Sequence, residues 1–298
     1  MRDRIRVLVD AAVASGSTIS VEELRLLMPT TQFPNDNVLK QFLMSDELLS
    51  RQLAEVGGEI TVRGREDLAH DRRSQRLLAR ARFAQAEDFL RTLERICPWI
   101  ELAGISGSLA YGGAKPGDDV DFFLVTARRR LWISLFLAMA TARLQRLRFG
   151  NSPAYCFNRI VERADCEKTF RESREPLFVR EALNLAILRG KGLYRHLLVS
   201  APWMETIFPE LFAAQLGELG DADTPTREKG CAVGRIANAI AFLALGPYLW
   251  LAGLVRNVRL QRMGRDIECF RTVIRQDRYA TDSILYDELR VVYRQAFA

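Results

Sequence analysis

Two aspartates, Asp119 and Asp121, flank a single apolar residue just before the apolar run 122–125. The β-branched and aromatic residues of this run, preceded by a Pro-Gly turn signal at 116–117, predict a buried strand. Side chains alternate between the two faces of a strand, so both carboxylates point the same way. Two ionised carboxylates at this spacing repel each other, and a hard divalent cation such as Mg²⁺ would relieve that repulsion through its oxygen ligands.

Ten residues separate the pair Gly107-Ser108 from Asp119, and a short apolar stretch ending at Ile105 precedes this pair. Glycine lets the backbone turn tightly and approach a ligand closely. If residues 109–111 begin a helix, its first N–H groups lack partners within the helix and attract phosphate oxygens, and the Ser108 hydroxyl adds a donor. One strand-turn-helix-strand unit would then place a phosphate cradle beside a metal site.

These residues resemble the signature of the polymerase-β-type nucleotidyltransferase superfamily. Its pattern is a hydrophobic residue, any residue, Gly-Ser, a spacer of the length found here, and Asp-hydrophobic-Asp-hydrophobic. Residues 105–108 and 119–122 match it position by position. The longer stretch from the helix before Pro98 to Trp132 is also similar to bacterial proteins that contain this domain and have no settled substrate.

The resemblance implies a fold and an activity. It implies a nucleotidyltransferase core in which Asp119 and Asp121 hold Mg²⁺ and Gly107 and Ser108 bind the β- and γ-phosphates of a nucleoside triphosphate. The implied reaction is transfer of a nucleoside monophosphate to an acceptor hydroxyl or phosphate. Which triphosphate and which acceptor are used is not specified by any residue, because fold does not determine the acceptor pocket.

The superfamily usually completes its site with a third carboxylate on a nearby strand, which helps to deprotonate the attacking hydroxyl. The next predicted strand, residues 155–162, contains one carboxylate, Glu162, at its far end, and Asp165 follows in the turn. Asn158 lies in the middle of this strand, where the third acid is expected, and an amide cannot act as a base. We assign Glu162 as the base. Asp165, a site without a third acid, and Glu162 as a solvated strand end remain open.

Three further features have both a functional and a structural interpretation. Lys115 lies in the turn between the two motifs, where it could reach a triphosphate or simply be solvated. Tyr111 is suited to stacking on a base or to packing in the core. The run Arg128-Arg129-Arg130 follows the predicted strand and could bind phosphates or form a solvated charged face.

The composition is typical of a soluble globular protein of two or three modest domains: 298 residues, 48% hydrophobic and 27% charged. The net charge of +6 and the pI near 9.2 favour nucleotides, nucleic acid or an anionic membrane without selecting among them. Five cysteines without a Cys-x-x-Cys pair, and two histidines, do not fit a zinc site. Charges interrupt residues 1–15, so we expect no signal peptide and a reducing cytoplasm.

The chain divides into three predicted regions. Residues 1–65 read as three short helices and a hairpin, a winged-helix-like module. Such a module can bind DNA, but its third helix has Lys40 as its only basic residue, so a packing or dimer-forming role is favoured. A long helix over 66–97, stopped by Pro98, opens a nucleotidyltransferase core that extends to residue 170. We expect residues 171–298 to form a helical C-terminal region.

The stretch 239–255 contains no charged residue, and Gly246-Pro247 is expected to kink or break it. A membrane-spanning helix needs about 20 such residues, with a lower limit near 17. Its aromatic residues Tyr248 and Trp250 lie near the middle rather than at the ends, where interface aromatics belong. A buried pair of core helices, a membrane-associated segment on the cytoplasmic side and a dimer interface remain open.

The combined expectation is an α/β (α+β) fold: a small mixed-sheet nucleotidyltransferase core with a winged-helix-like N-terminal module and a helical C-terminal region. The expected activity is Mg²⁺-dependent transfer of a nucleoside monophosphate from a triphosphate to an unknown acceptor. The alternatives are a catalytically degenerate nucleotide-binding regulator and a DNA-binding regulator acting through residues 1–65.

Overall fold

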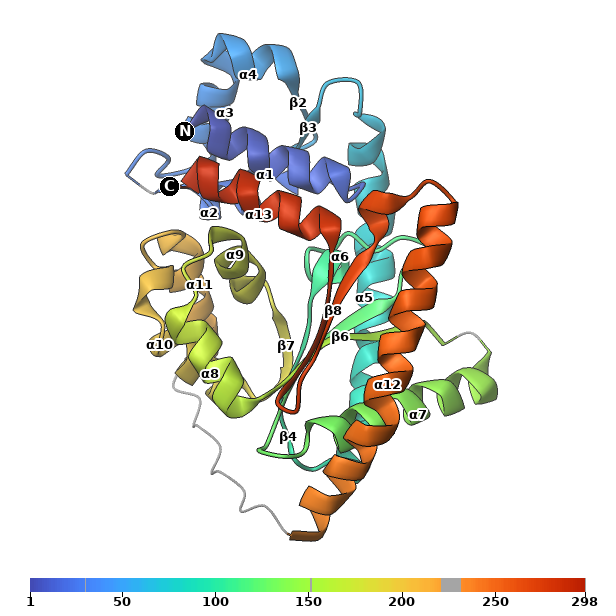
Figure 1. Ribbon diagram of the computed structural model, residues 1–298. Coiled ribbons are helices and arrows are strands. Elements are labelled where there is room, and N and C mark those ends of the chain that lie inside the picture. Colours follow the sequence, from blue (N-terminus) through green and yellow to red (C-terminus); the bar gives the residue numbers. More distant parts are fainter. Residues whose placement is uncertain (30, 151, 221–231, 298) are drawn as a thin grey trace.

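The computed structural model describes residues 1–29, 31–150, 152–220 and 232–297. They form a mixed α/β fold in which helices surround a six-stranded and a three-stranded sheet (Figure 1). This confirms the expected α/β class.

The six-stranded sheet combines strands from the middle and from the last part of the chain. The strands are β4 (Ile100–Ile105), β5 (Val120–Thr126), β6 (Tyr155–Glu162), β7 (Ala186–Arg189), β8 (Phe270–Ile274) and β9 (Arg278–Ser283). Their order is β7-β4-β5-β6-β9-β8. β5 runs antiparallel to β4 and parallel to β6, and all other neighbours are antiparallel. The strand predicted from residue 120 onward is therefore central and paired on both sides.

Alternate residues of β5 enter two separate hydrophobic clusters, as expected for a strand covered on both faces. Phe122 and Leu124 belong to one cluster, and Phe123 and Val125 belong to the other. Because side chains alternate along a strand, Asp121 shares the face of Phe123.

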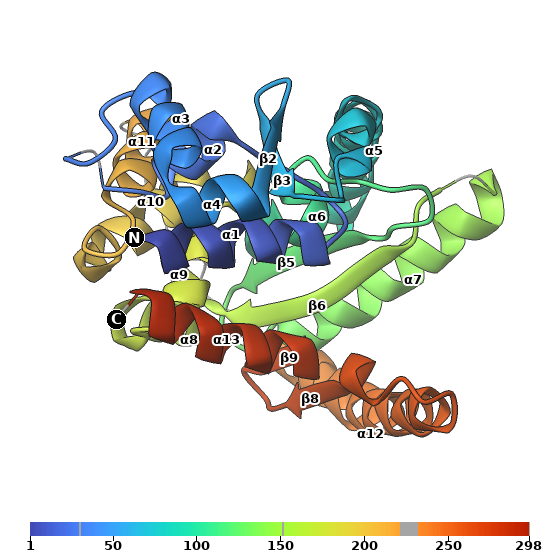
Figure 2. The same cartoon turned by 90° about the horizontal axis from the view of Figure 1, so that it is seen from above.

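Three long helices cover the face of the sheet that bears Phe122. They are α5 (Asp67–Ile96), α7 (Leu131–Phe149) and α12 (Ala232–Arg262). Phe89, Trp132 and Ala241 bring these helices into one cluster with the sheet, and α7 lies against α12 (Figure 2). α5 confirms the long helix predicted over residues 66–97.

The opposite face, which bears Asp121, is covered by shorter helices and by the N-terminal region. The helices are α8 (Arg163–Glu172), α9 (Pro176–Leu183), α10 (Lys191–Val199), α11 (Pro209–Leu219) and α13 (Ile284–Phe297). Leu183, Leu197 and Tyr293 of these helices share one hydrophobic cluster with Ile5 and Leu24 of the N-terminal region.

The N-terminal region contains one helix more than expected and a small antiparallel sheet of order β1-β3-β2. Its elements are α1 (Arg2–Ala14), β1 (Ile19–Ser20), α2 (Val21–Leu26), α3 (Asp36–Ser45), α4 (Glu47–Gln52), β2 (Leu53–Val56) and β3 (Glu59–Val62). Ser20 and Glu23 form a capping box at the start of α2. α1 packs beside α13, so this region is built into the body of the protein (Figure 1).

The prediction of a helical region from residue 171 onward is wrong in part, because strands β7, β8 and β9 lie within it. β7 extends one edge of the main sheet, and the hairpin of β8 and β9 completes the other. The β-branched residues Thr272, Val273 and Ile274 favour a strand over a helix, and residues 275–277 form the connection to β9.

The expected break at Gly246-Pro247 is also absent, because α12 is one helix that continues through Pro247. Proline has no N–H to donate to the carbonyl of Leu243, one turn earlier. Leu243 and Pro247 both lie on the exposed side of the helix, so the missing bond does not lie in the interior of the protein.

Candidate functional site

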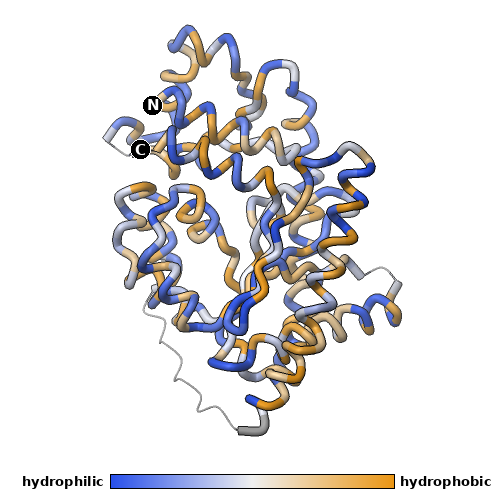
Figure 3. Tube along the Cα trace, in the orientation of Figure 1, coloured by the Kyte–Doolittle hydropathy of each residue, from blue (hydrophilic) through white to orange (hydrophobic). Residues whose placement is uncertain are grey.

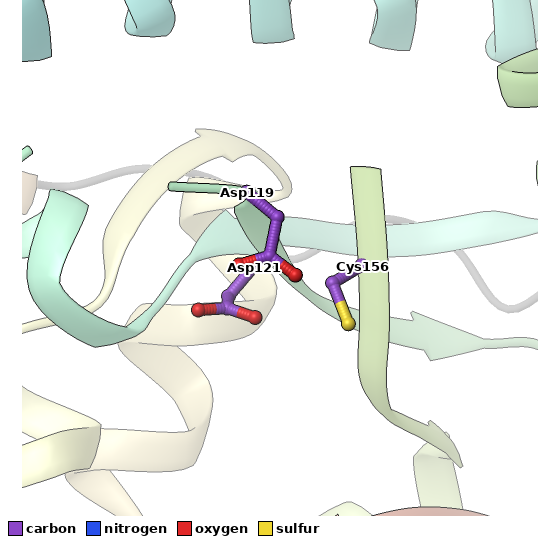
Figure 4. Close-up of side chains that lie close together, drawn as sticks. All are labelled: Asp119, Asp121 and Cys156. Carbon is purple, nitrogen blue, oxygen red and sulfur yellow. The ribbon is translucent and has the colours of Figure 1, made fainter. Parts of the chain in front are cut away.

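The two aspartates meet a cysteine of the neighbouring strand at the start of β5 (Figure 4). One ligand atom each of Asp119, Asp121 and Cys156 lies within 4.8 Å of the others. Asp119 is exposed, whereas Asp121 and Cys156 are half-buried. Cys156 is opposite Asp121 because β5 and β6 pair in parallel in this register.

An amide, Asn158, holds the inner aspartate in place. Its Nδ2 donates to Asp121 Oδ1 at 2.5 Å. Its Oδ1 accepts from the Thr281 hydroxyl at 3.0 Å and from the Cys156 thiol at 2.9 Å. These two donors orient the amide so that its nitrogen faces the carboxylate. The position expected for a third acid is therefore occupied by a group that cannot accept a proton.

The electrostatics of the site oppose its negative charge. Burial, followed by the charges of Asp119 and Asp118, raises the pKa of Asp121 to about 7. Burial, followed by the charges of Asp121 and Asp119, raises the pKa of the Cys156 thiol, which stays protonated at neutral pH. A cation bound by the two carboxylates would remove the repulsion between them.

Gly107 brings the backbone against the same carboxylate. It begins the short helix α6 (Gly107–Ala110) with φ of +68°, a left-handed conformation that favours glycine. A Cβ added there would lie 2.7 Å from Asp121 Oδ2. The amide of Ser106 donates to the Asp121 carbonyl oxygen at 2.9 Å, so the turn is tied to β5. The structure thus brings together the two motifs that the sequence places ten residues apart.

Substituting alanine for Gly107 is expected to disturb the site more than the fold. The positive φ alone destabilises an L-residue by about 1–2 kcal/mol, and the new methyl group also displaces the Asp121 carboxylate. Gly117→Ala is the matched control, because Gly117 has φ of +90° and nothing within 4 Å of an added Cβ. Urea denaturation should show that Gly107→Ala lowers the free energy of unfolding more than Gly117→Ala does. Equal losses would contradict the contact with Asp121.

A cavity of about 360 Å³ opens beside this turn. Gly107, Ser108 and Tyr111 form one wall. The other walls come from α1, α2, α5, α9, α11 and the start of α13, and most of the residues that they contribute are apolar. Segments from both ends of the chain therefore enclose the space next to the aspartates. A partly apolar recess of this size with a few polar groups is typical of a small-molecule site.

Two charged residues of this cavity, on α9, were not predicted from the sequence as site residues: Arg180 and Glu181. Arg180 is 7% exposed, lies over the Tyr111 ring at 4.9 Å, and donates to the Tyr293 hydroxyl. Within the described residues it forms no ion pair. Glu181 accepts from the Tyr111 hydroxyl at 2.9 Å, and its charge contributes to the raised pKa of Asp121. A charged pair inside the apolar run 176–183 is the signal that would have revealed them.

Glu162, our predicted base, does not reach the aspartates. A register shift between β5 and β6 pairs Glu162 with Thr126, on the opposite face from Asp121. Five residues along a strand also separate Thr126 from Asp121, roughly 16 Å. The Glu162 carboxylate instead accepts from the Arg129 amide at 2.6 Å. The arginines at 128–130 lie at the same distant end of β5.

Other residues for which the sequence allowed a functional role also have structural partners. Asp165 forms an ion pair with Arg278 at 2.7 Å. Lys115 donates its ammonium to the Ser15 carbonyl oxygen at 2.6 Å, which ties the turn between the motifs to the N-terminal region. Lys40, the one basic residue of α3, forms an ion pair with Glu55 at 2.8 Å, which leaves less positive charge for a nucleic acid.

Comparisons with protein-family models, with curated proteins and with solved structures found no match to this chain.

Proposed function

We propose that the protein is a Mg²⁺-dependent nucleotidyltransferase of the polymerase-β type that transfers a nucleoside monophosphate from a nucleoside triphosphate to an acceptor. The observation that supports this most directly is the contact between the two motifs. Asp119 and Asp121 lie at the start of β5, and the Gly107 backbone packs against Asp121 with no room for a side chain. Metal ligands and a phosphate-binding turn at this proximity suit a metal-bound triphosphate.

The residues present fit Mg²⁺. Asp119 and Asp121 offer hard oxygen ligands, and the raised pKa of Asp121 marks a carboxylate whose charge needs compensation. The Cys156 thiol is protonated and donates to Asn158, so it is not suited to replace an oxygen ligand. Mg²⁺ bound there would neutralise phosphate charge and stabilise the attacking and leaving oxygens.

The remaining residues bind and orient the substrates. Gly107 and Ser108 would bind the phosphates through the amides at the start of α6, which the Ser106 side chain does not cap. The cavity beside them would receive the part of the substrate that extends beyond the phosphates. Its apolar walls exclude water from the reacting groups.

The missing third acid favours an acceptor that is already ionised. No third carboxylate oxygen joins the metal-ligating group of Asp119 and Asp121 within the described residues. A phosphate or carboxylate acceptor needs no base to remove a proton. Arg180, buried at the cavity wall without an ion-pair partner among the described residues, is suited to bind such an anion.

A second candidate is a regulator that binds nucleotide without turnover. The observation that favours it is again Asn158, an amide where the superfamily usually has its third acid. Both candidates require the metal-nucleotide site, and they differ in whether pyrophosphate is released.

The test is a thermal-shift series with ATP, GTP, CTP and UTP, with and without Mg²⁺, followed by a pyrophosphate-release assay with phosphate, carboxylate and hydroxyl acceptors. A ligand at 100 times its dissociation constant stabilises the fold by about 2.7 kcal/mol. We expect one nucleotide to raise the melting temperature only with Mg²⁺. The double variant Asp119→Asn/Asp121→Asn should lose this response. Glu162→Gln, a matched loss of a carboxylate at the distant end of β6, should keep it.

Pyrophosphate release would support the transferase, and Mg²⁺-dependent binding without release would support the regulator. An equal response of the native protein and the double variant would contradict both.

A further inference from the structure

One side of α12 is apolar and uncovered along most of its length. Ile240, Leu243, Trp250, Leu251 and Leu254 recur at helical spacing and are all exposed, Leu243 by 72% and Trp250 by 61%. Figure 3 shows that α12 is mainly hydrophobic and has hydrophilic residues at both ends. Helix 234–262 is long and apolar enough to cross a membrane, and only 28% of its most apolar window is buried. The expectation of a buried pair of core helices is therefore wrong.

The inner side of α12 is held to the body of the protein by two asparagines. Asn238 Oδ1 accepts from the backbone amides of Trp132 and Ile133, at 2.8 and 3.2 Å, and so caps the start of α7. Asn257 exchanges two hydrogen bonds with the backbone of Phe270 in β8, at 2.8 and 2.9 Å. A helix that left the protein to cross a bilayer would break all four bonds. The helix therefore presents its apolar side while lying along the surface.

The charges of α12 itself have one sign. Residues 232–262 contain four arginines and no acidic residue, whereas Arg265, beyond the helix, pairs with Glu268. Arg235 lies before the apolar stretch, and Arg256, Arg259 and Arg262 lie at its end, all exposed. An apolar helix face with arginines at its ends is typical of helices that lie in the interface of an anionic membrane.

A second copy of the chain is a poorer partner for the same face. Two copies paired about a two-fold axis that runs along the helix direction would place each arginine near its own equivalent, and two copies paired about an axis perpendicular to the helix would run antiparallel. Arg235 of one copy would then approach Arg256 and Arg259 of the other, with no acidic residue of the helix between them. Anionic lipid headgroups would instead neutralise these arginines.

We propose that α12 docks the protein onto an anionic membrane, with the helix in the plane of the interface and its Ile240–Leu254 side among the lipid chains. This inference does not depend on the proposed enzymatic activity.

The test is co-sedimentation of the full chain with phosphatidylglycerol vesicles and with phosphatidylcholine vesicles. We expect binding to the anionic vesicles and much weaker binding to the zwitterionic ones. Leu243→Glu/Trp250→Glu should reduce binding at least about tenfold, because buried apolar area drives interfacial binding. Removing charge by Arg259→Gln should reduce binding to the anionic vesicles about fivefold. Leu77→Glu is the control, since Leu77 is 59% exposed on α5, away from this face.

Circular dichroism and melting temperature would verify that each variant is folded. Equal sedimentation of the native protein and the double variant, or no binding to either kind of vesicle, would overturn the proposal. So would a dimer in light scattering that the double variant dissociates, because a second copy would then cover the face.

Discussion

Replacing Asp121 with asparagine is expected to abolish nucleotidyl transfer and, at the same time, to stabilise the metal-free protein above neutral pH. The carboxylate is half-buried beside two other acids, and its pKa is raised to about 7. An asparagine at position 121 retains a side-chain oxygen that can accept the hydrogen bond from Asn158, but it carries no charge. A metal ligand contributes several kcal/mol to the transition state, so activity should fall by about a thousandfold.

The stabilisation by Asp121→Asn has a defined pH dependence. In the unfolded chain Asp121 titrates near its ordinary value of 3.8, and in the folded protein near 7. The native protein therefore loses stability as the pH rises through this interval, because the folded state resists ionisation. The variant does not titrate there. The stability advantage of the variant should be absent below about pH 4, grow between pH 4 and 7, and level off above pH 7, at about 4 kcal/mol.

Urea denaturation of both proteins between pH 4 and 8, in the presence of a chelator, measures this difference. Glu162→Gln is the matched control: it removes a carboxylate on the opposite face of the sheet and should leave transfer activity intact. A constant difference across the pH range would show that Asp121 is ionised at its ordinary pKa. Transfer at the native rate by the Asp121→Asn variant would refute its role as a metal ligand.

Replacing Arg72 with alanine should produce the largest loss of stability. Arg72 is 2% exposed, and burial lowers its pKa. Its guanidinium donates to the Tyr111 carbonyl oxygen at 2.7 Å, to Ser17 Oγ at 2.9 Å and to the Glu23 carboxylate at 3.4 Å. These bonds join α5, the N-terminal region and the cavity wall. Removing one member of a buried charged network costs about 3–5 kcal/mol.

The measurement is the urea midpoint of Arg72→Ala compared with Arg73→Ala, a substitution at the next, exposed position of α5. The control should change the free energy of unfolding by less than about 0.5 kcal/mol. If nucleotide binding requires the cavity wall, the Arg72→Ala variant should also bind nucleotide less tightly at temperatures where it is folded. A loss of stability no greater than that of Arg73→Ala would mean that the network contributes little.

The carboxylate pair and its turn were predictable because they depend on local rules. Alternation along one strand puts Asp119 and Asp121 on the same side, and the backbone freedom of Gly107 is a property of that residue. Glu162 could not be placed in this way. The register shift within β6 interrupts the alternation, so residues 160 and 162 lie on the face opposite Asp121. Such a shift is determined by pairing with β5 and is not apparent in the sequence of β6 alone.

The larger errors of prediction concern elements whose structure depends on contacts between distant parts of the chain. The hairpin of β8 and β9 follows a long helix and is rich in arginine, and it lies within the region that we predicted to be helical. Its pairing with β6 determines its conformation. Arg180 and Glu181 become part of the cavity only when α9 packs beside α6 and α13. No local sequence pattern predicts such packing, although charged residues within an apolar helix are consistent with it.

The order in which the strands are made has a consequence for biosynthesis. β6 pairs on one side with β5, but its other neighbour, β9, is translated more than a hundred residues later. Thr281, which helps to orient Asn158, arrives with that last strand. A ribosome-bound chain therefore exposes β6 as an open sheet edge for a long interval, the condition under which nascent proteins aggregate. Such a late, long-range closure makes folding slow and makes the site one of the last parts of the protein to form.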